Sequence, residues 1–298
     1  MHVSTSNPAL IMFLIDRSGS MSDRDPETGL RLSELASQAV NQAIYDIALN
    51  VCMGHDGIRD RVHLSVYGYG DRRSPDLVQW SLEGLPDAGG WVGAEEWVPA
   101  YTDIEEQAVA SDGARAITRE VPVWVKPLAE GRTQMATAFR RAGKIVAAHM
   151  RKHPHSPPPI VINITDGHPG DVKTSNENWT GLQSAASEIL GHIGPSGLPI
   201  LLNVHLDPKS PDPIVFPPIE PQGTDRYARN MYRISSPLPD WMVRNARAAG
   251  HPLEPGSRGL IVNASPDLLS SFLSVGTTLR LTSALQPPPS PDSPFICS

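Results

Sequence analysis

Three nearly unbroken apolar runs, separated by long helical patterns, constrain the fold of this chain most strongly. They cover residues 9–15, 160–165 and 198–206, and each has a length typical of a strand. An apolar run without polar alternation indicates a strand that is buried on both faces, as in a parallel sheet. Apolar residues recur at helical spacing over 32–51 and 135–149, which predicts helices between these strands. We therefore expect an α/β fold with a doubly wound, mostly parallel central sheet and helices on both faces.

The rest of the chain continues this alternation, with two interruptions and a tail. Strands are predicted over 61–70, 77–82, 121–125 and 259–263, with 121–125 at an edge because Pro122 cannot donate to a ladder. Helices are predicted over 179–190, 239–249 and 266–279. We expect a single domain over 1–285, with insertions near 71–120 and 207–223. Residues 286–298 hold five prolines and are expected to form a disordered tail.

Composition narrows the classes of partner. The formal net charge is −7 and no long basic run occurs, so neither nucleic acid nor an anionic membrane surface is an expected partner. No stretch approaches the ~20 apolar residues that span a bilayer. The first apolar run is short and lacks preceding lysine or arginine, so it is interpreted as a strand, not a signal peptide. Two cysteines, Cys52 and Cys297, are too few for a disulfide framework. We expect a cytoplasmic protein.

Oxygen-bearing side chains follow the predicted strands. Asp16, Ser18 and Ser20 come directly after the first run, Thr133 lies in a glycine loop that opens a helix, and Asp166 follows residues 160–165. In open α/β sheets, ligands bind beyond the carboxyl ends of the strands. Hard oxygen donors suit Mg²⁺ better than Zn²⁺. Taken alone, Asp16 or Ser18 could equally cap the following helix, but the three segments together favour a metal site.

These motifs resemble the metal-ion-dependent adhesion site, or MIDAS, of von Willebrand factor A (vWA) domains, a family that includes the integrin inserted domain. The resemblance covers roughly residues 8–280. It implies a vWA/Rossmann-like sheet of six main strands, one of them antiparallel at an edge. It also implies a Mg²⁺ or Mn²⁺ ion held by Ser18, Ser20 and Thr133, with Asp16 and Asp166 in contact directly or through water. One coordination position would remain for an Asp or Glu of a partner protein.

The expected function is therefore a non-enzymatic, metal-dependent protein–protein interaction module. The motif sequences resemble those of bacterial intracellular members of this family, which are commonly encoded beside an AAA-type ATPase or beside kinase and phosphatase partners. No Gly-x-Ser-x-Gly elbow, Walker-type loop or His-Glu-x-x-His motif occurs. Two alternatives remain: a Mg²⁺-dependent phosphoesterase, for which His168 is the base nearest in sequence, and a structural subunit with a vestigial metal site.

Three other features admit a functional and a structural interpretation. His149, His153 and His155 could bind a softer metal, but we interpret them as a solvated helix end. Trp91 and Trp97 could anchor an interface, although packing of the insertion against the sheet is favoured. Cys52 is interpreted as a buried structural cysteine and not as a nucleophile.

Overall fold

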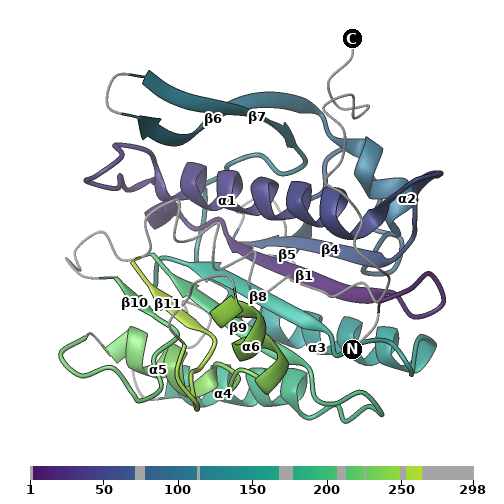
Figure 1. Ribbon diagram of the computed structural model, residues 1–298. Coiled ribbons are helices and arrows are strands. Elements are labelled where there is room, and N and C mark those ends of the chain that lie inside the picture. Colours follow the sequence, from purple (N-terminus) through teal and green to yellow (C-terminus); the bar gives the residue numbers. More distant parts are fainter. Residues whose placement is uncertain are drawn as a thin grey trace.

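The computed structural model describes residues 3–70, 78–112, 115–167, 177–206, 213–224, 226–248 and 253–263. Its centre is a seven-stranded sheet with the order β10-β11-β9-β8-β1-β4-β5 (Figure 1). The strands and helices run along the chain as follows: β1 (Ala9–Asp16), α1 (Leu32–Ile47), β2 (Met53–Gly54), β3 (Gly57–Ile58), β4 (Val62–Tyr69), β5 (Val78–Trp80), α2 (Ala94–Trp97), β6 (Asp103–Asp112), β7 (Arg115–Val123), α3 (Met135–Lys152), β8 (Ile160–Thr165), α4 (Glu177–Leu190), β9 (Ile200–His205), β10 (Ile214–Val215), α5 (Arg226–Ile234), α6 (Asp240–Ala248) and β11 (Leu260–Val262).

The five central strands are parallel and are buried along their whole length, as the apolar runs predict. Strand β1 pairs with β4 from Ala9 opposite Val62 to Asp16 opposite Tyr69, and its other side pairs with β8. Strands β8, β9 and β11 continue the parallel order. The strands therefore deliver the residues that follow β1 and β8 to one edge, here called the carboxyl edge. The opposite edge, where the parallel strands begin, is the amino edge.

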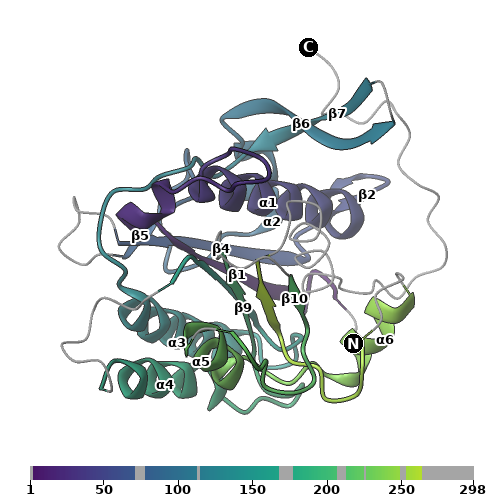
Figure 2. The same cartoon turned by 90° about the vertical axis from the view of Figure 1, so that its left-hand side faces the viewer.

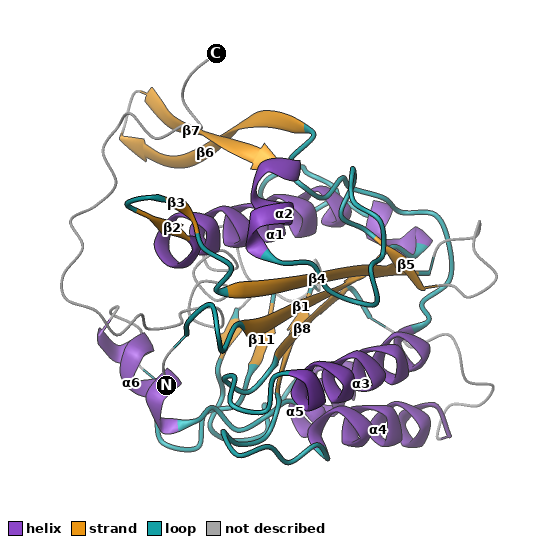
Figure 3. Ribbon diagram, turned by 90° about the vertical axis from the view of Figure 1, so that its right-hand side faces the viewer, coloured by secondary structure: helices purple, strands orange, loops and turns teal. Residues whose placement is uncertain are grey.

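Helices cover both faces of the sheet (Figures 1 and 3). Helices α1 and α6 pack against the face that carries Ile11 and Phe13 of β1. Helices α3, α4 and α5 pack against the other face, which carries Leu10 and Met12. Alternate side chains of β1 thus enter two separate apolar cores, as expected for a strand that is covered on both sides. Among the described residues, none of the helices has the length and apolarity needed to cross a bilayer.

The outermost strand is antiparallel on each side of the sheet, whereas the resemblance to vWA domains implies only one antiparallel edge strand. Strand β5 pairs antiparallel with β4, and β10 pairs antiparallel with β11 at the far edge. Strand β10 lies inside the segment 207–223 that was predicted to be loop. It is only two residues long and is flanked by Pro213 and Pro217, which cannot donate to a ladder.

The insertion contains a second, smaller sheet. Strands β6 and β7 form a two-stranded hairpin that lies beyond α1, away from the central sheet (Figures 1 and 2). The predicted edge strand 121–125 is confirmed in part, because residues 121–123 end β7, but β7 belongs to this hairpin and not to the central sheet. Asn41 of α1 holds the following segment, since its Oδ1 accepts hydrogen bonds from the backbone N–H groups of Trp124 and Val125, both at 3.0 Å.

Helix α5 was not predicted, whereas α6 and β11 match the expected helix and strand near the C-terminus. The predicted helix 266–279 and the proline-rich tail 286–298 lie outside the described residues.

Candidate functional site

Three segments that are distant in sequence meet at the carboxyl edge. The backbone N–H of Gly19 donates to the carbonyl of Gly131 at 3.0 Å, and the N–H of Glu130 donates to the carbonyl of Arg17 at 2.7 Å. The loop that carries Thr133 is thereby fixed against the turn that carries Ser18 and Ser20. Thr133 itself is buried, two residues before the start of α3.

Gly70, directly after β4, allows this close approach. Its φ is +99°, a conformation that favours glycine. A Cβ atom at this position would lie 2.8 Å from the carbonyl oxygen of Arg132 and 3.2 Å from the backbone nitrogen of Ser18. The turn after β1, the end of β4 and the loop before α3 are therefore packed backbone against backbone, with no space for a side chain.

Asp16 is fully buried at the end of β1 and its carboxylate is held at both oxygens. Its Oδ1 accepts a hydrogen bond from the backbone N–H of Ser18 at 2.8 Å, and its Oδ2 accepts one from the hydroxyl of Thr165 at 2.7 Å. The N–H of Gly167 donates to the same Thr165 hydroxyl at 3.1 Å. Thr165 is a site residue that the sequence argument missed, although its place beside Asp166 at the end of β8 was a signal for it.

The hydroxyl groups of Ser18 and Ser20 lie 3.1 Å apart on this turn. Ser18 is buried and Ser20 is exposed, so the pair runs from the interior toward solvent. Asp166 is at the same edge, and a hydrogen bond from Ser20 links its carboxylate to the turn. The five predicted residues therefore come from three segments that meet at one edge of the sheet. Four of them, Asp16, Ser18, Ser20 and Asp166, are connected through hydrogen bonds or charge interactions of their side chains.

Two carboxylates lie close together at this edge, and burial disfavours the charge of each. Burial raises the pKa of Asp16 to about 7, and the charge of Asp166 adds to the rise, while hydrogen bonds from Thr165 and Ser18 oppose it. Burial also raises the pKa of Asp166, against a hydrogen bond from Ser20 and the nearby charge of His205 at the end of β9. His205 is a second neighbour that the sequence argument did not include.

The donor set fits a hard cation. The Oδ1 atom of Asp166 is buried and has no hydrogen-bond partner. Buried polar atoms without a partner are rare and costly in native proteins. Two carboxylates, an unpartnered carboxylate oxygen and nearby hydroxyls are ligands that Mg²⁺ and Mn²⁺ prefer, and the five predicted ligands include neither sulfur nor nitrogen.

The structure confirms some of the remaining sequence interpretations and contradicts one. Cys52 is buried, and burial raises the pKa of its thiol to about 12, so its interpretation as a structural cysteine is confirmed. Trp97 is fully buried and its indole N–H donates to the carbonyl of Val62 at 3.0 Å, so it packs the insertion onto the sheet. His168 lies outside the described residues. The interpretation of His149 as part of a solvated helix end is wrong, because this residue is fully buried on the inner face of α3.

Similarity to known proteins is found in structure and not in sequence. No protein-family model matches it, and no curated protein matches it in sequence. The pilus adhesin SpaC from Lactobacillus rhamnosus GG is similar at 12% identity and a TM-score of 0.52, over 92% of this chain and 30% of SpaC. This chain thus corresponds to a minor part of that adhesin. At this identity the similarity supports the α/β arrangement and not a binding activity.

Two further solved structures are similar at lower scores. The manganese-loaded TRAP protein of Plasmodium vivax has a TM-score of 0.37 and 13% identity, over 85% of this chain and 75% of that one. The PilB minor pilin of Streptococcus sanguinis has a TM-score of 0.43 and 9% identity, over 90% of this chain and 60% of that one.

Proposed function

We propose that this chain is a protein-binding module that works through a divalent cation at the carboxyl edge. Asp16, Ser18, Ser20, Thr133 and Asp166 would hold Mg²⁺ or Mn²⁺, as in the MIDAS of vWA domains that these motifs resemble. The observation that carries the proposal is the buried pair of carboxylates, in which Asp166 Oδ1 lacks a partner and the pKa of Asp16 is raised to about 7. A cation between them would relieve both conditions.

The chain's own residues divide the work of such a site. Thr165 and the N–H of Ser18 fix both oxygens of Asp16, so this carboxylate is oriented before any ligand arrives. The exposed hydroxyl of Ser20 brings the site to the surface. When bound, the cation would supply a coordination position for an Asp or Glu of the partner. We place the protein in a multi-protein bacterial system associated with an ATPase or with kinase and phosphatase partners.

Metal binding is tested first, by calorimetric titration of the metal-free protein with Mg²⁺ and with Mn²⁺. One equivalent should bind, and Asp16→Ala and Ser20→Ala should weaken binding at least tenfold. Ser22→Ala is the matched control, because Ser22 is an exposed serine of the same turn. Ser20 is also exposed, so loss of binding in its variant is separated from misfolding by an unchanged circular dichroism spectrum.

Partner binding is tested with the immobilised protein in the presence of Mg²⁺ and after EDTA. A captured partner should be lost with EDTA and with Thr133→Ala, and regained when Mg²⁺ is restored. Capture that is unaffected by these treatments would refute the proposal. Turnover of phosphoester substrates that depends on Asp16 would replace it with the enzymatic alternative. Absence of Mg²⁺ and Mn²⁺ binding at millimolar metal would instead support a structural subunit with a vestigial site.

A further inference from the structure

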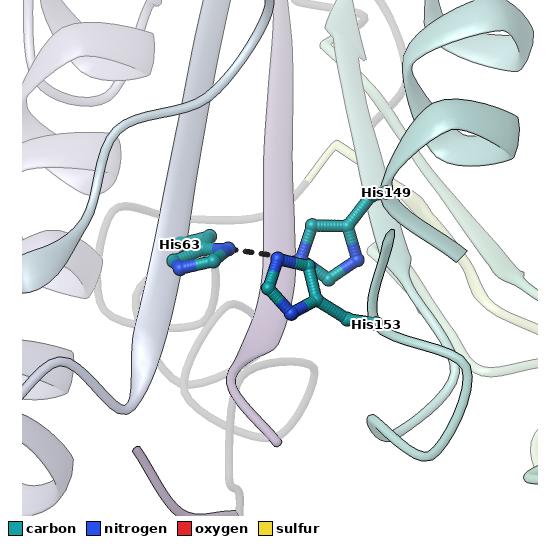
Figure 4. A group of neighbouring side chains, drawn as sticks. All are labelled: His63, His149 and His153. Carbon is teal, nitrogen blue, oxygen red and sulfur yellow. Dashed lines mark hydrogen bonds between the residues drawn. The ribbon is translucent and has the colours of Figure 1, made fainter. Parts of the chain in front are cut away.

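Three histidines from β4 and from the end of α3 meet near the amino edge of the sheet (Figure 4). His63 is the second residue of β4, His149 lies in the last turn of α3, and His153 directly follows that helix. One nitrogen from each ring lies within 4.8 Å of the others, and Nδ1 of His63 shares a hydrogen bond of 3.0 Å with Nε2 of His149. The cluster is therefore convergent at its nitrogen atoms and is not merely a stack of rings.

The backbone explains how two of these residues share one face. His149 and His153 are four positions apart, and the N–H of His153 donates to the carbonyl of His149 at 2.8 Å, so the helical spacing continues to His153. His149 continues the apolar stripe of α3 that packs on the sheet. On β4, His63 points to the same side as Tyr67 and Tyr69, which pack in the core below α3.

The nitrogens of the cluster have few other partners. Nδ1 of His149 and Nε2 of His153 are buried and make no hydrogen bond. Burial lowers the pKa of His149 to about 3, and it lowers the pKa of His153 as well, so these imidazoles are neutral near pH 7. Neutral imidazole is the form that binds a metal ion. Nε2 of His153 is thus a buried polar atom without a partner, which is rare in native proteins, whereas Nδ1 of His149 is not the nitrogen that faces His63.

His63 also has the neighbour that metal-binding histidines usually have. Its Nε2, on the opposite side of the ring from Nδ1, lies 3.5 Å from Oδ2 of Asp60. Asp60 is fixed in turn, because its Oδ1 accepts a hydrogen bond from the N–H of Ala94 at 2.8 Å. A carboxylate behind a ligating imidazole orients the ring and sets its tautomer. The negative charge of Asp60 would also offset part of the charge of a bound cation.

The surroundings leave a place for a fourth ligand. A small pocket beside the cluster is lined by His149, His153 and Ser156, together with prolines 157–159. The hydroxyl of Ser156 is buried without a partner. The Trp91 ring also packs against the cluster: it stacks on His63 with 6.3 Å between centroids and an interplanar angle of 17°, and it meets His149 edge-on with 5.2 Å between centroids.

We propose that His63, His149 and His153 bind a divalent transition-metal ion of the zinc class through three imidazole nitrogens. Zn–N bonds of about 2.0–2.1 Å in a tetrahedral arrangement place the nitrogens about 3.3–3.4 Å apart. The observed separations, from 3.0 Å to at most 4.8 Å, bracket that spacing. Imidazole donors select Zn²⁺ over Mg²⁺, so this site and the carboxyl-edge site would take different ions.

The two sites are separate in space. His63 pairs in register with Leu10, six residues before Asp16 on β1. At a rise of about 3.3 Å per residue, this places the histidine cluster about 20 Å from Asp16, at the amino edge of the sheet. The proposal therefore does not depend on the proposed function, and either one can fail without the other.

Zn²⁺ alone is the probe. The full chain is freed of metal with EDTA, dialysed into millimolar Mg²⁺ to saturate the oxygen site, and titrated with Zn²⁺ by calorimetry. One equivalent should bind, and Co²⁺ in its place should give the visible absorption of a tetrahedral nitrogen site. His153→Ala should weaken Zn²⁺ binding at least tenfold, since it removes a ligand. His155→Ala is the matched control and should change nothing, because His155 is exposed on the same segment.

Three results would overturn the proposal. The first is no Zn²⁺ binding by the wild-type chain at concentrations up to 100-fold above that of the protein. The second is an equal loss of binding in the His153 and His155 variants. The third is loss of Zn²⁺ binding in Asp16→Asn, which would assign the ion to the oxygen site. Because His149 is fully buried and its replacement would disturb the core, His153→Gln, checked by circular dichroism, serves as the second ligand variant.

Discussion

Replacing Asp16 with asparagine should stabilise the metal-free protein at high pH. The carboxylate of Asp16 is fully buried, and burial together with the charge of Asp166 raises its pKa from 3.8 to about 7. Asparagine keeps the shape of the side chain and an oxygen that accepts the hydrogen bond from Ser18. It removes the ionisation that this buried position disfavours.

The sign and size follow from proton linkage. A group whose pKa is higher in the folded state binds more protons in that state. The contribution of Asp16 to wild-type stability is therefore greatest below pH 4 and falls as the pH rises to 7. A pKa of about 7 in place of 3.8 corresponds to about 4 kcal/mol, since each pKa unit is worth about 1.4 kcal/mol. Asp16→Asn should therefore exceed the wild type by up to about 4 kcal/mol at pH 8, and by nothing attributable to this group below pH 4.

The assay is urea unfolding followed by tryptophan fluorescence, at several pH values and in EDTA. Subtracting the wild-type curve from the variant curve removes the groups that titrate alike in both. Because Asp16 and Asp166 interact, the difference belongs to the pair. Asp56→Asn is the control, since Asp56 is highly exposed and its loss should change stability by less than about 0.5 kcal/mol. A difference between Asp16→Asn and wild type that is independent of pH would refute the reasoning.

Added Mg²⁺ should reverse the order of the two proteins. A ligand that binds only the folded state stabilises it in proportion to the logarithm of its concentration. The wild type should therefore gain stability with millimolar Mg²⁺, whereas Asp16→Asn should not. An equal gain in both proteins would show that Asp16 does not take part in binding.

Two further substitutions probe the packing around the site. Gly70→Ala should lower the free energy of unfolding by about 1–3 kcal/mol because φ is positive at this position. It should also reduce the rise in thermal midpoint that Mg²⁺ produces, since the added Cβ would lie against the backbone of Arg132 and Ser18. Gly57→Ala carries the same strain but meets nothing within 4 Å, so its Mg²⁺ response should stay intact; equal responses would contradict the prediction. Asn163→Ala should lower the free energy of unfolding, measured with urea, by about 2–5 kcal/mol, because two buried hydrogen bonds are lost: the Tyr69 hydroxyl donates to Asn163 Oδ1 at 2.9 Å, and Asn163 Nδ2 donates to Asn203 Oδ1 at 3.1 Å. Tyr69→Phe should cost less, and a larger loss in that variant would exclude the explanation.

Local patterns were sufficient to predict the five parallel strands of the central sheet, but not its edge strand β10. The runs that became β1, β8 and β9 are apolar because both of their faces are covered, so each strand carries its own signal. Helix α5 was missed although Ala228, Met231 and Ile234 are buried at helical spacing. These three residues stand among arginines and tyrosines in a helix of nine residues, so the apolar stripe was too short to recognise.

The candidate sites show where such patterns stop. Asp16 and Asp166 were found because each directly follows a strand, and their neighbours in sequence define the motif. Thr165 and Gly70 contribute through contacts with a different segment, which periodicity does not contain. The histidine cluster depends on His63, which is 86 residues from His149 and has no motif that links it to the helix.

Helix α3 connects the two proposed metal sites. It begins two residues after Thr133 and carries His149 in its last turn, so its 18 residues reach from one edge of the sheet to the other, about 27 Å. A ligand that shifts or steadies this helix at one end acts on the same rigid element at the other. Any factor by which Zn²⁺ changes the affinity for Mg²⁺ must then equal the factor by which Mg²⁺ changes the affinity for Zn²⁺. Titrating each ion in the presence and absence of the other would measure this factor directly.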